Sequence, residues 1–141
     1  MPASAPVSPV VSARIIHAAL MFGVLLFCVV AFYVGSRASL TVSELPDRRF
    51  LYIALFLASA ILFGGAVFSA GRLPPPGPGT SQDDWWRANL GRAVVIWGLV
   101  ETPALLGTVA YLITHDFRTL IATFTGLLLF VNYRPSRLAE L

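Results

Sequence analysis

Residues 97–107 read WGLVETPALLG, and this stretch contains the only carboxylate deep inside an apolar segment of the chain. Glu101 follows the mostly apolar residues 93–100 and precedes the mostly apolar residues 102–113. The combined segment is long enough to cross a bilayer, with Glu101 near its middle. An ionisable group at that depth costs roughly 2.5–3.5 kcal/mol on insertion scales, so it indicates a functional site.

Two residues that follow Glu101 add to the polar character of this point. Thr102 supplies a hydroxyl group. Pro103 has no backbone N–H to donate, and its ring clashes with the carbonyl of Leu99, which predicts a helix kink at Pro103. We therefore predict an ion-binding pair, Glu101 and Thr102, that is suited to a proton or a small cation.

The composition of the chain places it in a membrane. It has 141 residues, of which 57% are hydrophobic and 12% charged, and its mean hydropathy is +0.77. These values exclude an ordinary soluble domain and a disordered chain. The apolar residues form long blocks, which predicts an all-α integral membrane protein whose first partner is the lipid bilayer. The net charge of +3 comes from arginines in the loops and requires no nucleic-acid partner.

Four apolar blocks predict four transmembrane helices arranged as two hairpins: residues 15–34, 50–70, 93–113 and 117–133. We expect one transmembrane domain over residues 13–134. A disordered tail, residues 1–12, precedes it, and a short polar tail, residues 135–141, follows it. Ser81 to Asp84 has the pattern of a capping box, so the third helix should begin there and continue unbroken into the membrane. The hairpin after it should place Asp116 at the N-cap of the fourth helix.

The arginines predict the orientation of these helices. All ten basic residues are arginine, which together with the abundance of Ala, Gly and Pro is typical of GC-rich bacterial coding. Six arginines fall on the side of the two termini and four on the opposite side. The positive-inside rule then predicts a multi-pass protein of the bacterial inner membrane with both termini in the cytoplasm.

Small and aromatic residues suggest how the helices pack and where they meet the membrane surface. Small residues at three- and four-residue spacings form a ridge on the second helix, which predicts close helix packing. The ridge consists of Ala54, Ala58, Gly65 and Ser69. Trp85 and Trp86 precede the third span, where interfacial aromatic anchors are expected.

The sequence does not indicate an enzyme. His17 opens the first helix and His115 closes the third, so the two imidazoles should lie at opposite membrane surfaces, about 30 Å apart. We interpret both as interfacial side chains. The single cysteine, Cys28, permits no disulfide within the chain. We expect no catalytic residue, no metal site and no cofactor.

The motif around Glu101 resembles a known family. Residues 98–107, GLVETPALLG, look like the second helix of subunit c, the proteolipid of rotary F-type ATP synthases. The preceding small-residue-rich helix and Arg72-Leu73-Pro74 loop extend the resemblance. It implies that Glu101 is the ion-carrying carboxylate and that Thr102 matches a hydroxyl residue that helps to bind sodium in some members. The glycine-alternating run of the family's first helix is absent here. The whole layout also resembles small four-span bacterial membrane proteins, which implies no activity.

Two functions are compatible with these features. The first is a proteolipid-like membrane subunit whose Glu101 binds a proton, and which assembles with other copies of itself or with other subunits. The alternative is a non-catalytic accessory or scaffold subunit of a respiratory or photosynthetic membrane complex. In that case Glu101 is protonated, since apolar surroundings favour the neutral form, and it serves only to fix helix packing.

Overall fold

The computed structural model describes residues 7–37 and 48–139, and this part of the chain is entirely helical apart from its turns. Its elements are α1 (Pro9–Arg37), α2 (Arg48–Ala70), α3 (Gln82–Thr114), the 3₁₀ helix η1 (Phe117–Thr119), α4 (Leu120–Asn132) and α5 (Pro135–Leu138). The all-α prediction is confirmed. By length and composition, α1, α2 and α3 can each cross a membrane, whereas the apolar segment of η1 and α4 is shorter.

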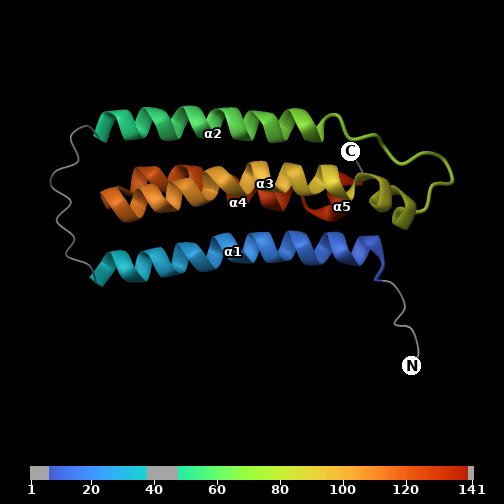
Figure 1. The fold of residues 1–141 in the computed structure, drawn as a ribbon, viewed down its shortest axis with the longest axis horizontal. Coiled ribbons are helices and arrows are strands. Elements are labelled where there is room, and N and C mark those ends of the chain that lie inside the picture. Colours follow the sequence, from blue (N-terminus) through green and yellow to red (C-terminus); the bar gives the residue numbers. More distant parts are fainter. Residues whose placement is uncertain (1–6, 38–47, 140–141) are drawn as a thin grey trace, which may run out of the picture.

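The longest helix, α3, is the centre of the fold. The helices α1 and α2 lie on opposite sides of it, and α4 runs along it (Figure 1). Its 33 residues correspond to about 50 Å at 1.5 Å per residue. Half of the residues in the apolar stretch of α3 are buried, compared with 17% in that of α1 and 11% in that of α2. The segment that contains Glu101 is therefore the helix on which the others pack.

Both ends of α3 are fixed by local chemistry. The backbone N–H of Asp84 donates to Ser81 Oγ at 3.1 Å, so Ser81 caps the helix as predicted, and its first acidic residues face the positive end of the dipole. At the other end, His115 adopts φ 53°, and its N–H donates to Tyr111 O at 2.8 Å. Between these caps the helix continues through Pro103, as expected from the unbroken apolar run.

The two ends of the helical domain differ from the prediction. The helix α1 begins at Pro9, so residues 9–12 belong to it and not to a disordered tail. Residues 1–6 of that tail, and most of the loop predicted before Arg48, lie outside the described residues. After α4, Pro135 opens a further helical turn, and Leu138 is only 1% exposed. Residues 135–138 therefore pack onto the protein as α5, because Pro135 is buried and Leu138 belongs to the hydrophobic core.

A close backbone approach joins α3 to the η1–α4 segment. A Cβ atom at Gly126 would lie 2.6 Å from Ala104 Cβ, and one at Gly107 would lie 2.7 Å from Thr119 O. Neither position has room for a side chain, so glycine lets the two backbones touch. Thr123 strengthens this contact by donating its hydroxyl to Ala104 O at 2.9 Å.

The ridge that the sequence suggested on α2 makes looser contacts. A Cβ atom at Gly65 would meet Leu99 Cδ1 of α3 at 3.7 Å, which is an ordinary van der Waals distance. Ala54 is exposed, and Ala58 and Ser69 are partly exposed. The tightest small-residue packing is thus on α3 and α4, and a role for the α2 ridge in assembly stays a prediction.

The two tryptophans predicted as interfacial anchors are buried within the protein. Trp85 is 4% exposed and Trp86 is 2% exposed. The indole N–H of Trp85 donates to Pro74 O at 2.8 Å, and the ring of Trp86 stacks on Trp97 with centroids 6.2 Å apart. Both side chains therefore pack within the protein, and their position at a membrane surface stays a prediction.

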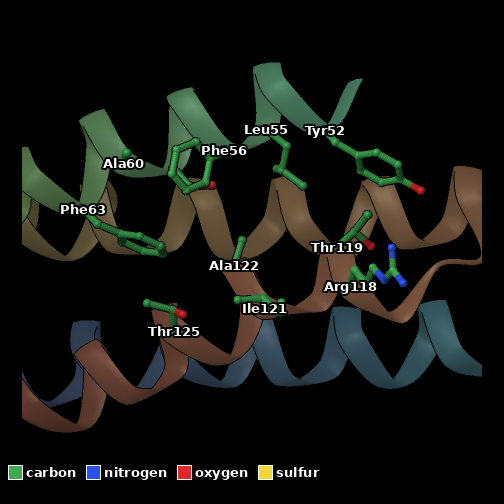
Figure 2. A pocket seen from close by; sticks show the side chains of 11 residues that line it. Tyr52, Leu55, Phe56, Ala60, Phe63, Arg118, Thr119, Ile121, Ala122 and Thr125 are labelled. Atoms are coloured by element: carbon green, nitrogen blue, oxygen red, sulfur yellow. The ribbon is translucent and has the colours of Figure 1, made fainter. Parts of the chain in front are cut away.

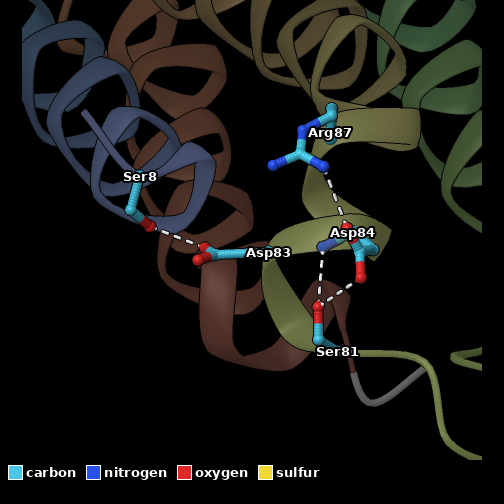
Figure 3. A network of polar contacts seen from close by, with 5 residues as sticks. All are labelled: Ser8, Ser81, Asp83, Asp84 and Arg87. Carbon is cyan, nitrogen blue, oxygen red and sulfur yellow. Dashed lines mark hydrogen bonds and ion pairs between the residues drawn. The ribbon is translucent and has the colours of Figure 1, made fainter. Parts of the chain in front are cut away.

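A polar network holds the same end together (Figure 3). The Ser8 hydroxyl donates to Asp83 Oδ1 at 2.6 Å and so joins the start of α1 to the first turn of α3. Asp84 accepts from the Ser81 hydroxyl at 2.7 Å and pairs with Arg87 at 2.9 Å. The ion pair is exposed and contributes little, but the Ser8 contact fixes where α1 begins.

Candidate functional site

Glu101 occupies the position along α3 that the sequence suggested. It lies nine residues after Arg92 and thirteen before Thr114, or about 14 Å and 20 Å along the helix axis. Its side chain is partly exposed, and its carboxylate has no hydrogen-bond or ion-pair partner among the described residues. An acid in this setting can bind a proton, because no cation compensates its charge.

Thr102 and Pro103, the two residues after Glu101, differ from it in exposure and in hydrogen bonding. Thr102 is exposed, and its hydroxyl donates to Gly98 O of the preceding turn at 2.9 Å. No hydrogen bond joins Thr102 to Glu101 within the described ranges, and ion binding by the pair stays a prediction. Pro103 is fully buried inside α3. The kink at Pro103 stays a prediction.

One face of α3 beside Glu101 is open. Cβ atoms added at Gly91 and Gly98 would meet nothing within 4 Å. Along the same helix Val95, Thr102 and Val109 are exposed. Glu101 therefore lies next to a surface of small and apolar residues that this chain leaves uncovered.

His17 lies in the core, contrary to the prediction of an interfacial side chain. It is 7% exposed, and its Nε2 donates to Phe130 O at 2.9 Å. Its ring packs edge-on against Trp97 and Phe130, with centroids 5.2 and 5.6 Å away. His115 lies eighteen residues beyond Trp97 on α3, or about 27 Å. The two imidazoles thus do not share a site, and His17 is a hydrogen-bonded packing residue near the middle of α3.

A second polar cluster ties α2 to the hairpin after α3. Asp116 accepts from the backbone N–H of Arg118 at 2.9 Å, which is the N-cap that the sequence predicted, and from the Tyr52 hydroxyl at 2.8 Å. These donors favour the charged form, so the Arg118 N–H first, and Tyr52 second, hold the pKa of Asp116 below its ordinary value. The contact with Tyr52 was not predictable from the sequence, since the two residues are 64 positions apart.

This cluster predicts an acid sensitivity at the hairpin. Because the folded-state pKa of Asp116 is lowered, its stabilisation is present above the ordinary value of about 3.9 and is lost as the pH falls through the folded pKa. We expect the melting temperature of the protein in detergent to fall more steeply below about pH 4 than that of the Asp116→Asn variant. Parallel pH profiles of the wild type, Asp116→Asn and the matched Tyr52→Phe variant measure this. Identical acid slopes for the wild type and Asp116→Asn would contradict it.

A groove with a volume of about 460 Å³ lies between α2 and the η1–α4 segment (Figure 2). Tyr52, Arg118 and Thr119 lie toward one end, and Phe63 and Thr125 toward the other. Ser59 also lines it; this side chain is 8% exposed, and its Oγ has no hydrogen-bond partner. No sequence pattern predicted this groove, because it depends on how far α2 stands from α4.

A second hollow, of about 430 Å³, lies between the end of α2 and α3. Arg72 and Arg92 both line it, and the Arg72 guanidinium stacks over the Phe68 ring at 4.1 Å. Arg92 precedes Glu101 on α3, whereas Arg118 lies four residues after Thr114, the last residue of α3. Arginines therefore flank the apolar part of α3 at both ends.

No three His, Cys, Asp or Glu side chains in the described part of the chain lie close enough to share a metal ion. The candidate site is therefore a single carboxyl group on an open helix face, with a groove and a hollow elsewhere on the surface. Comparisons of the chain with protein-family models, with curated proteins and with solved structures found no match.

Proposed function

We propose that this protein is an integral membrane subunit whose Glu101 binds a proton within the bilayer. The observation that carries the proposal is the unpaired, partly exposed carboxyl group of Glu101 in the apolar part of the central helix. A group that is neutral in lipid and charged when it meets water or an arginine of another subunit can carry a proton. The likeness of residues 98–107 to the carboxylate helix of the rotary proteolipid supports the same role.

The membrane location rests on helix length and on the arginines. From Arg92 to Thr114, α3 extends about 33 Å, close to the hydrocarbon thickness of about 30 Å. Arg92 lies at one end of this interval and Arg118 just beyond the other. We propose four membrane crossings, with η1 and α4 as the shortest, in a bacterial inner membrane with both termini in the cytoplasm.

A second candidate function is an accessory or scaffold subunit without ion transport. It is favoured by the open face of α3, where Gly91 and Gly98 would let another helix approach closely. In that role, a neighbouring subunit would accept a hydrogen bond from the protonated Glu101. Both candidates predict an oligomer or a larger membrane complex. They differ in the expected effect on proton transport when Glu101 is replaced by a residue that cannot titrate.

Two experiments test the role of Glu101: its modification by a carboxyl-reactive carbodiimide, and the proton transport of Glu101 variants. Such reagents need a protonated acid in apolar surroundings, so we expect mass spectrometry to find modification at Glu101 that slows as the pH rises. Asp83, which accepts from Ser8 at the end of α3, should stay unmodified and serves as the internal control. Modification at Asp83 in place of Glu101 would contradict the proposal.

Transport separates the two candidate functions. If Glu101 carries protons, Glu101→Gln should assemble normally in reconstituted vesicles but abolish proton movement, since glutamine keeps the shape and cannot titrate. If Glu101 only packs against a neighbour, Glu101→Gln should be nearly silent. Glu101→Leu should then weaken assembly through loss of a hydrogen bond worth roughly 0.6–2 kcal/mol in lipid. Proton flux that survives Glu101→Gln would exclude the carrier.

A further inference from the structure

The groove between α2 and the η1–α4 segment has its charged group at one end and is mostly apolar along the rest of its length, where Ser59 and Thr125 are the polar lining residues. Tyr52, Arg118 and Thr119 gather at the end next to the hairpin (Figure 2). The remaining lining is mostly apolar: Leu55, Phe56, Ala60, Phe63, Ile121 and Ala122. The change in polarity runs along α2, which in a membrane is the direction from the surface toward the centre of the bilayer.

The length of the groove matches one leaflet. From Tyr52 to Phe63 the lining extends over eleven residue-to-residue steps of α2, or about 16 Å along its axis. Half of a hydrocarbon core about 30 Å thick is about 15 Å. Phe56, Ala60 and Ile121 line the groove and are exposed, so the groove opens outward. In a bilayer a chain-shaped apolar space of this kind is filled by an acyl chain.

The charge at the polar end selects the headgroup. Arg118 is exposed and lines the groove, and Arg48 is at the start of α2 on the same side. Among the described residues, the acid near them is Asp116, which already accepts hydrogen bonds from Tyr52 and from the Arg118 backbone. Two guanidinium groups against one carboxylate leave this end positive, and guanidinium groups bind phosphate oxygens well.

We propose that the groove holds one acyl chain of an anionic phospholipid from the leaflet on the hairpin side, with its phosphate bound to the Arg118 guanidinium. The chain lies between the apolar side chains of α2 and α4 and closes the gap that these helices leave. This site is separate from Glu101, and it does not depend on whether Glu101 carries protons.

Native mass spectrometry of the purified, delipidated full-length protein tests this site. Dioleoyl phosphatidylglycerol and dioleoyl phosphatidylcholine have the same chains and differ in headgroup charge. We expect one phosphatidylglycerol to bind with about fivefold higher affinity than phosphatidylcholine, the effect of one arginine near a lipid headgroup. Arg118→Gln should remove this preference, whereas Arg48→Gln, which changes the charge beside the groove, should keep most of it.

Steric variants test the acyl chain. Ala60 lines the groove, whereas Ala54 is an exposed alanine of the same helix that does not. We expect Ala60→Trp to abolish binding of both lipids and Ala54→Trp to leave it unchanged. Millimolar inorganic phosphate should displace neither lipid. Equal affinity for the two lipids, equal losses in Arg118→Gln and Arg48→Gln, unchanged binding in Ala60→Trp, or displacement by phosphate would each overturn the proposal.

Discussion

Gly126→Ala is expected to destabilise the protein by about 1–3 kcal/mol, since the added methyl group overpacks the contact between α3 and α4. The new Cβ atom would lie 2.6 Å from Ala104 Cβ and 3.1 Å from the carbonyl oxygen of Val100. Backbone and Cβ atoms cannot rotate away, so the two helices must separate. Chemical unfolding in detergent micelles, followed by circular dichroism, measures the change.

Gly98→Ala is the matched control for this substitution. Gly98 is also a helical glycine, but a Cβ atom there would meet nothing within 4 Å. Alanine favours a helix by up to about 1 kcal/mol over glycine, so this variant should be unchanged or slightly more stable. If both substitutions shift the unfolding midpoint equally, the close contact between α3 and α4 is not what holds α4 in place.

Trp97→Ala is expected to cost about 3–5 kcal/mol, the usual range for removing a large buried aromatic side chain. Trp97 is fully buried, its N–H donates to Tyr133 O at 2.8 Å, and its ring contacts His17 and Trp86. The substitution leaves a cavity where α1, α3 and the end of α4 meet. Thermal melting and size-exclusion chromatography in detergent both report it.

Two further variants divide this effect into its causes. Trp97→Phe keeps most of the ring but leaves Tyr133 O without its donor, so it should cost about 1–3 kcal/mol. Phe22→Ala removes an aromatic ring of α1 that is 63% exposed, and it should be nearly silent in detergent. A Phe22→Ala variant as unstable as Trp97→Ala would show that the loss reflects aromatic content and not the core.

The features of this fold that could be predicted from sequence are local ones. Hydropathy and length identify the apolar helices, since both are properties of one segment. The Ser81 cap and the Asp116 cap were also predictable, because each depends on a side chain and a backbone N–H two or three residues away. The position of Glu101 along α3 follows in the same way from counting residues.

The features that could not be predicted depend on which helices become neighbours. Trp86 and His17 are aromatic residues with a polar N–H group, and each lies near the end of an apolar stretch of sequence. Their burial depends on the elements that pack around them, which are α1, the 71–81 loop and α4. The close contact of α3 with α4 did leave a trace in the sequence. Ala104 with Gly107, and Ala122 with Gly126, are small residues spaced three and four apart on the two helices, the spacing of close helix packing. We predicted such packing from the same pattern on α2 alone.

The central place of α3 also constrains the order of events during biosynthesis. The chain emerges from the ribosome N-terminus first, so in the membrane topology proposed above α1 and α2 enter the bilayer before α3, which lies between them and contacts both. Lipid solvates their apolar sides as well as protein does, and each can persist there as an independent helix. Tertiary structure begins when α3 inserts between them. A nascent chain that stops before Ser81 would thus contain two membrane helices without the helix on which both pack.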